Sequence, residues 1–242
     1  MIKNILGRVF ALWSVLVFAS TMLLFIFPIW AAGIFGEPIS TVWMIRCSRM
    51  WMALYFPLSF INVKIIGKEH FKKGENYIVV CNHNSFMDVP LSSPGIPGPN
   101  KTIAKIEMSR IPLFGIIYKR GSVLIDRKNE DSRKESYQEM KQILQMGMHM
   151  CIYPEGTRNK TDQPMKSFHD GAFRLSMETE KKIIPAIIRG TKEMLPNDKT
   201  FFFWPGKISM QFLNPVDPKD FKEVTDLKNH VFDVMLNQLK NY

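Results

Sequence analysis

The sequence predicts an α/β domain, with a mixed sheet and helices on both of its faces, preceded by a membrane-inserted segment of two helices. Two observations carry this prediction. The chain begins with a long stretch without formal charge, and from about Asn62 onward short apolar, β-branched runs alternate with helical patterns. We therefore expect a membrane-associated helical segment over residues 1–60 and an α/β domain over residues 61–242.

Composition and charge limit the classes of protein and partner. The 242 residues suit one main domain, and 46% hydrophobic with 22% charged residues excludes a disordered chain. The 32 Lys and Arg residues against 22 Asp and Glu give a net charge of +10. This excess predicts a partner that carries phosphates: a nucleic acid, an anionic membrane surface or a phosphorylated substrate.

The first apolar stretch runs from Val9 to Phe35 without a formal charge, too long for a signal-peptide core of about 7–15 residues. Its part from Val9 to Phe27 would be roughly 28 Å long as a helix, close to the bilayer core of about 30 Å. We expect Pro28 to interrupt this helix. The alternative is a pair of core helices in a soluble protein.

The second stretch, Ile39 to Phe60, places apolar residues at helical spacing, while Arg46 and Arg49 share another side. This pattern predicts an amphipathic interfacial helix whose arginines reach toward lipid phosphates. A membrane location disfavours nucleic acid as the partner, since the sequence also lacks a helix-turn-helix signature and a basic stripe interleaved with aromatics.

The orientation follows from charges and cysteines. Lys3 and Arg8 favour a cytoplasmic amino terminus, and the three cysteines lack CxxC spacing, which favours a reducing compartment. A complete span would place the domain on the opposite side. A helical hairpin, or insertion in the plane of the membrane, therefore fits better.

Seven short apolar runs are the candidate strands. They are Val63 to Ile66, Tyr77 to Cys81, Thr102 to Ala104, Ser122 to Ile125, His149 to Tyr153, Ile183 to Ile188 and Ile208 to Leu213. Helices are expected from Ser132, as the N-cap of a capping box with Glu135, to Met146, and from Asp226 to Lys240. Long loops at strand ends, such as Pro154 to Asp170, are where sites in α/β sheets are built.

His83 and Asp88 form the first candidate site, at the end of an apolar strand. Five residues apart, they would point about 140° apart on a continuous helix, so their pairing requires a turn before the helix begins. The alternative is a capped loop histidine with Asp88 on a solvated face. Ser85 suits an N-cap better than a nucleophile, since no GxSxG motif surrounds it, and no second histidine stands at zinc-ligand spacing.

The second candidate site follows another apolar strand. Gly156 permits an unusual backbone angle or close approach, Thr157 offers a hydroxyl and Arg158 presents a guanidinium that matches phosphate oxygens. Lys105 and Arg127 also follow apolar runs, so several cations are expected to meet at one edge of the sheet. Each of them, taken singly, is more often a solvated surface cation.

Four sequence blocks resemble the glycerolipid acyltransferases. The run His83 to Asp88 resembles their His-x4-Asp motif, and the blocks at Gly121–Arg127, Tyr153–Arg158 and Ile184–Ala186 resemble the second, third and fourth motifs in the same order. Two departures put acceptor or acyl-chain preference in question. His169 stands where lysine is common, and Leu124 replaces a frequent phenylalanine.

The resemblance implies that His83 is a general base and that Asp88 orients it. It places the phosphate of the acceptor at the third block, where Glu155 is expected to orient a neighbouring cation. Neither a metal nor an organic cofactor is implied. The full predicted set for phosphate binding is Lys105, Arg127, Glu155, Gly156, Thr157 and Arg158.

The resemblance further implies acyl transfer from an acyl thioester, on acyl carrier protein or CoA, to lysophosphatidic acid, which gives phosphatidic acid. Its bacterial members carry an amino-terminal membrane segment, so the cytoplasmic face of a bacterial inner membrane is expected. Two alternatives remain: another lysolipid acceptor, such as lyso-ornithine lipid, and a non-catalytic module that binds membrane lipids.

Overall fold

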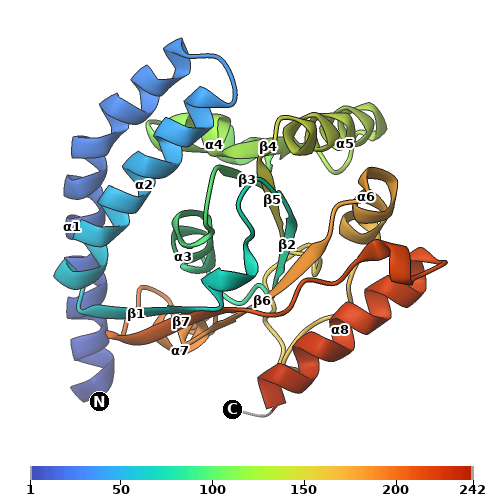
Figure 1. The fold of residues 1–242 in the computed structure, drawn as a ribbon. Helices are drawn as coiled ribbons and strands as arrows, with labels where there is room; N and C mark the ends of the chain where they lie inside the picture. Colours follow the sequence, from blue (N-terminus) through green and yellow to red (C-terminus); the bar gives the residue numbers. More distant parts are fainter. Residues whose placement is uncertain (1, 241–242) are drawn as a thin grey trace.

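The computed structural model describes residues 2–240 and contains one seven-stranded sheet in the order β1-β7-β6-β2-β5-β3-β4 (Figure 1). Neighbouring strands are parallel except for the antiparallel pair β6 and β7, so the predicted mixed sheet is confirmed. The strands are β1 (Ile61–Ile66), β2 (Ile78–Cys81), β3 (Asn100–Lys105), β4 (Ser122–Ile125), β5 (His149–Ile152), β6 (Ile183–Arg189) and β7 (Gly206–Phe212).

All seven predicted strands are present, and their ends differ from the prediction by at most two residues. Strand alternation explains why helices cover both faces of the sheet. In β2, Ile78 and Val80 enter one apolar core, whereas Val79 and Cys81 enter the other. Both faces of this strand are therefore buried, as its uninterrupted apolar sequence indicates.

The helices divide between these two cores (Figure 1). The core that holds Ile78 is covered by α5 (Glu130–Gln145), α6 (Gly171–Thr179) and α8 (Val224–Lys240). The opposite core is covered by α1 (Ile2–Ala31), α2 (Ile39–Leu58), α3 (Asp88–Gly95), α4 (Phe114–Gly121) and α7 (Thr191–Met194).

The capping box predicted at Ser132 is wrong. Asn129 is the N-cap of α5, and its Oδ1 atom accepts hydrogen bonds from the backbone N–H groups of Asp131 and Ser132. The hydroxyl of Ser132 instead accepts a hydrogen bond from the N–H of Asp126. Asn and Ser are equally good caps, so sequence spacing alone did not distinguish them.

The predicted interruption at Pro28 is also wrong, because α1 continues through this residue to Ala31. A proline inside a helix removes one backbone hydrogen bond and its ring crowds the preceding turn. The next residue, Ile29, is fully buried against the domain. We attribute the continuity of the last turn to this packing.

Helices α1 and α2 form an antiparallel hairpin that packs on the α/β domain along the whole of α1 (Figure 1). Trp51 Nε1 donates to Thr21 Oγ1 at 2.9 Å, and near the amino terminus the N–H of Phe203 donates to the carbonyl of Gly7 at 3.0 Å. At the other end, the guanidinium of Arg120 lies against Gly33. The outer side of α1 exposes large apolar residues, among them Val9, Leu12, Leu16, Leu23 and Phe27.

Within residues 2–240, the segment Ile2–Ile34 is the one helical stretch whose length and apolar composition would allow it to cross a membrane. The prediction for the arginines of α2 is wrong for Arg49. Its guanidinium donates to the carbonyls of Pro94 and Ile96, at 3.0 and 2.7 Å, and so holds the carboxyl-terminal end of α3. Arg46 lies over the ring of Trp43.

Candidate active site

Four parallel strands bring their carboxyl ends to one edge of the sheet, as expected for a site in an α/β fold. His83 follows β2, Lys105 ends β3, Arg127 follows β4 and Tyr153 follows β5. These residues line one cavity of about 680 Å³, which we call the cationic cavity. The predicted convergence of cations on this edge is confirmed.

His83 and Asp88 are in direct contact. His83 Nδ1 lies 2.8 Å from Asp88 Oδ2, and the carboxylate is fully buried whereas the imidazole is 18% exposed. The turn that sequence spacing required is present, since Asp88 begins α3. With Nδ1–H donating to the carboxylate, Nε2 is the nitrogen left to accept a proton on the cavity side.

The carboxylate of Asp88 has four hydrogen-bond donors. Besides His83, the N–H groups of Asn84 and Ser85 donate to Oδ2 at 2.6 and 2.8 Å, and Thr191 Oγ1 donates to Oδ1 at 2.6 Å. These donors supply the hydrogen bonds that a buried carboxylate needs. Ser85 is buried in this turn, where its hydroxyl accepts a hydrogen bond from the N–H of Met87, and the N-cap position of α3 is held by Met87 and not by Ser85.

Tyr153 packs against one face of the His83 imidazole. Its ring stacks on that of His83 with the centroids 4.3 Å apart, and its hydroxyl lies 2.7 Å from Ser92 Oγ. Burial raises the pKa of this hydroxyl well above its usual range. Tyr153 therefore places an uncharged aromatic ring against His83 and restricts its orientation. The motif alone did not reveal this contact.

The cationic cavity collects more positive charge than the motifs predict. Of the predicted phosphate ligands, Lys105, Arg127, Gly156, Thr157 and Arg158 all line it. Two further cations, Lys160 and Lys166, line it as well. Sequence reasoning missed these two because they lie in a polar loop without a motif.

Gly156 meets the backbone requirement that the sequence suggested. Its φ of 71° lies in the left-handed region, and a Cβ atom there would come within 2.9 Å of the His169 ring. Arg127 donates from Nη1 to the carbonyl of Gly156, and Lys166 Nζ donates to Thr157 Oγ1 at 2.6 Å. His169 thus packs beneath the third block, where its ring leaves no room for any side chain at position 156.

Glu155 lies apart from the other predicted phosphate ligands. It is 1% exposed and does not line the cavity. Its carboxylate accepts from the backbone N–H groups of His83, at 2.7 Å, and Lys166, at 2.9 Å, while burial raises its pKa. The geometry corrects the prediction, because Glu155 ties two loops of the site together instead of facing a ligand.

Arg158 packs on an aromatic ring at the rim. Its guanidinium carbon lies 3.5 Å from the centroid of Phe86, and its Nη1 donates to Asn197 Oδ1 at 3.3 Å. Asn197 in turn donates to the carbonyl of Asn84, next to the histidine. Asn197 lies more than a hundred residues from His83, and no sequence pattern indicated its place in the site.

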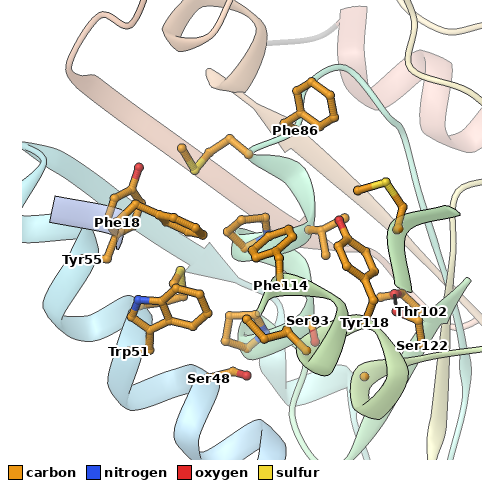
Figure 2. Close-up of a pocket in the computed structure, with 18 of the residues that line it drawn as sticks. Phe18, Ser48, Trp51, Tyr55, Phe86, Ser93, Thr102, Phe114, Tyr118 and Ser122 are labelled. Atoms are coloured by element: carbon orange, nitrogen blue, oxygen red, sulfur yellow. Dashed lines mark hydrogen bonds between the residues drawn. The ribbon is translucent and has the colours of Figure 1, made fainter. Parts of the chain in front are cut away.

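An apolar pocket adjoins the cationic cavity (Figure 2). Its volume is about 440 Å³, and it lies between α2, α3 and α4. Figure 2 shows Trp51, Phe114 and Tyr118 around it. Phe86 and Val89 line both the pocket and the cationic cavity, so apolar space begins beside the pair of His83 and Asp88.

Comparison with known proteins agrees with this geometry. Curated relatives named 1-acyl-sn-glycerol-3-phosphate acyltransferase include one from Cocos nucifera, 31% identical over 60% of this chain and 47% of the relative. The chain thus spans about half the length of this relative. Another, from Helicobacter pylori, is 27% identical over 81% of each chain.

The fold has a close solved counterpart. The crystal structure of the 1-acyl-sn-glycerophosphate acyltransferase PlsC from Thermotoga maritima superposes with a TM-score of 0.82, covering 100% of this chain and 98% of the other, at 24% identity. A family model described as Acyltransferase matches residues 62–189, which is more than half of the chain and includes both candidate sites. The chain belongs to the acyltransferase family.

Proposed function

We propose that this chain transfers an acyl group from an acyl thioester to the free hydroxyl of 1-acylglycerol 3-phosphate, giving phosphatidic acid. One observation carries the proposal: a histidine paired with a buried aspartate opens into a cavity lined by lysines and arginines. A general base and an anion-binding wall are what a phosphorylated alcohol acceptor requires. The names of the curated relatives support the same substrate class.

In the proposed reaction, His83 Nε2 takes the proton of the acceptor hydroxyl as its oxygen attacks the thioester carbonyl. Asp88 holds the other ring nitrogen and stabilises the imidazolium that forms. The tetrahedral intermediate collapses by breaking the carbon–sulfur bond, and the proton on His83 passes to the leaving thiolate. No covalent acyl-enzyme is needed, because the acceptor itself is the nucleophile.

Lys105, Arg127 and Arg158 are the proposed ligands of the acceptor phosphate, with Thr157 as a hydroxyl donor. Gly156 contributes by its backbone conformation, which keeps this wall of the cavity open. The apolar pocket in Figure 2 is the proposed place for the donated acyl chain, since it adjoins His83 through Phe86 and Val89. The proposed carrier of the thioester is acyl carrier protein or CoA.

We also propose that residues 1–60 attach the α/β domain, residues 61–242, to the cytoplasmic face of a bacterial inner membrane. Gly7 and Gly33 both contact the domain and would lie about 39 Å apart along a helix that rises about 1.5 Å per residue. This distance exceeds the thickness of a bilayer core, about 30 Å. A helix that packs on the domain over that length leaves no stretch free to cross the bilayer. This packing favours insertion in the plane of the membrane. Its exposed apolar side would enter the lipid.

A substrate panel tests the proposal. Purified full-length protein in mixed micelles is given one acyl-CoA or acyl carrier protein thioester with 1-acylglycerol 3-phosphate, lyso-ornithine lipid or lysophosphatidylcholine. Mass spectrometry of the lipid products is expected to show phosphatidic acid as the main product. Efficient acylation of another acceptor in preference would replace the proposed substrate, and failure with every acceptor would favour a non-catalytic lipid-binding module.

A further inference from the structure

A second apolar cavity borders the site and has no role in the proposed reaction. It is a groove of about 740 Å³ between α1 and residues 195–203. Ala11, Val15 and Ala19 line it from α1, and Phe201 and Phe202 line it from the other side. We call it the α1 groove.

The α1 groove runs up to the cationic cavity. Arg158 and Lys160 line both of them, and Phe86 lies at the boundary of the groove, the cationic cavity and the apolar pocket of Figure 2. Lys199 adds a further cation to the groove. The groove thus joins a mainly apolar floor to a positively charged end beside His83.

The groove also opens onto the outer apolar side of α1. Val15, on its wall, is 54% exposed, and Phe201, opposite, is 53% exposed. Leu12 and Leu16, near Val15 on the same helix, are exposed as well. A hydrocarbon chain can therefore pass from a lipid layer against α1 into the groove without crossing water.

We propose that the α1 groove holds the acyl chain that the acceptor already carries. This inference rests on the proposed function. The reaction brings two hydrocarbon chains to one histidine, and the structure offers two adjoining apolar spaces, which share a wall that includes Phe18, Phe86 and Phe114. The acceptor combines a single chain with a phosphate, and the groove is the space that continues directly into Arg158 and Lys160. The pocket of Figure 2 is then left for the donated chain.

Filling the groove tests the assignment. Ala19 is exposed on α1, so Ala19→Trp adds bulk to the groove without entering the core; Ala53→Trp, at an exposed position of α2 outside the groove, is the matched control. With a long-chain 1-acylglycerol 3-phosphate, Ala19→Trp is expected to lower kcat/KM at least about tenfold, because several methylene groups lose their burial. With a short-chain acceptor, the kcat/KM of Ala19→Trp is expected to match that of the control. Its KM for the thioester is expected to match the control as well.

An equal loss with long and short acceptors, or a change confined to the thioester, would overturn the assignment. Inactivity of the wild type with every lysolipid would be a failure of the proposed function instead, and it would show before any variant is compared.

Photocrosslinking gives a readout that needs no turnover. A lysophosphatidic acid with a diazirine at the end of its chain is bound to the full-length protein, and the labelled peptides that excess unlabelled lipid protects are identified. Labels at residues 199–203, which line the groove and not the pocket of Figure 2, are expected. Protected labels at residues 44–52 of α2 or 117–121 of α4, which line the pocket of Figure 2 and not the groove, would place the acceptor chain in that pocket and contradict the proposal.

Discussion

The hydroxyl of Thr191 donates a hydrogen bond of 2.6 Å to Oδ1 of Asp88, across 103 residues of sequence. Both side chains are fully buried. The bond connects the start of α7, after the fourth sequence block, to the carboxylate that orients His83. In the proposed mechanism Thr191 is a positioning residue, since it reaches His83 only through Asp88.

We expect Thr191→Val, which keeps the shape but removes the donor, to lower kcat by roughly 10- to 100-fold. A hydrogen bond to a charged group is worth about 1.5–3 kcal/mol, and here its loss leaves a buried carboxylate oxygen without a partner. KM for the acceptor is expected to stay within about twofold, and Thr191→Ser to restore most of the activity. Unchanged kcat in a folded Thr191→Val enzyme would remove Thr191 from the mechanism.

Arg158 tests the placement of the phosphate. Arg158→Ala is expected to raise KM for 1-acylglycerol 3-phosphate by roughly 10- to 100-fold, since a charge-assisted contact is lost, with little change in KM for the thioester. Arg133→Ala, at an exposed position of α5 outside the cavity, is the control. If thioester saturation suffers and acceptor saturation does not, the third block binds the donor.

Much of the fold follows from the sequence because a strand that is buried on both faces is apolar throughout, as β2 is. The histidine–aspartate pair and the glycine at position 156 were also predictable, since spacing and backbone conformation constrain them locally. Thr191 and Asn197 were not, because only tertiary contacts bring them to the site. Glu155 was misplaced since a motif gives residue identity but not the direction of a side chain.

His149 makes the fold sensitive to acid. Its ring is buried, its Nδ1 accepts from the N–H of Tyr77 at 3.0 Å, and burial lowers its pKa from 6.5 to about 4. Below pH 6.5 the unfolded chain binds a proton that the folded chain does not, so stability is lost as the pH falls toward 4, by roughly 3 kcal/mol in total.

We expect His149→Asn, which offers an oxygen to the same N–H, to lose less stability than the wild type between pH 7 and pH 4.5 in chemical denaturation. The exposed His230, changed to Asn, is the control. Parallel pH dependence of wild type and His149→Asn would show that other groups dominate the acid response.

The orientation of the amino-terminal hairpin can be measured by thiol labelling, because the three native cysteines are buried. Single cysteines at the exposed positions Asn4 and Lys128 are probed in sealed vesicles with a reagent that does not cross the membrane. In-plane insertion predicts that both label from the same, cytoplasmic side. Labelling from opposite sides would establish a complete span.

The most direct test of the account is the rate of phosphatidic acid formation by His83→Ala, with His230→Ala as the matched histidine control. Loss of a general base typically lowers the rate by about 10²- to 10⁴-fold. We expect His83→Ala to lose activity by at least about 10²-fold while its folding and membrane attachment are unchanged. His230→Ala is expected to keep near wild-type activity. A folded His83→Ala enzyme that forms phosphatidic acid at near wild-type rate would contradict the account.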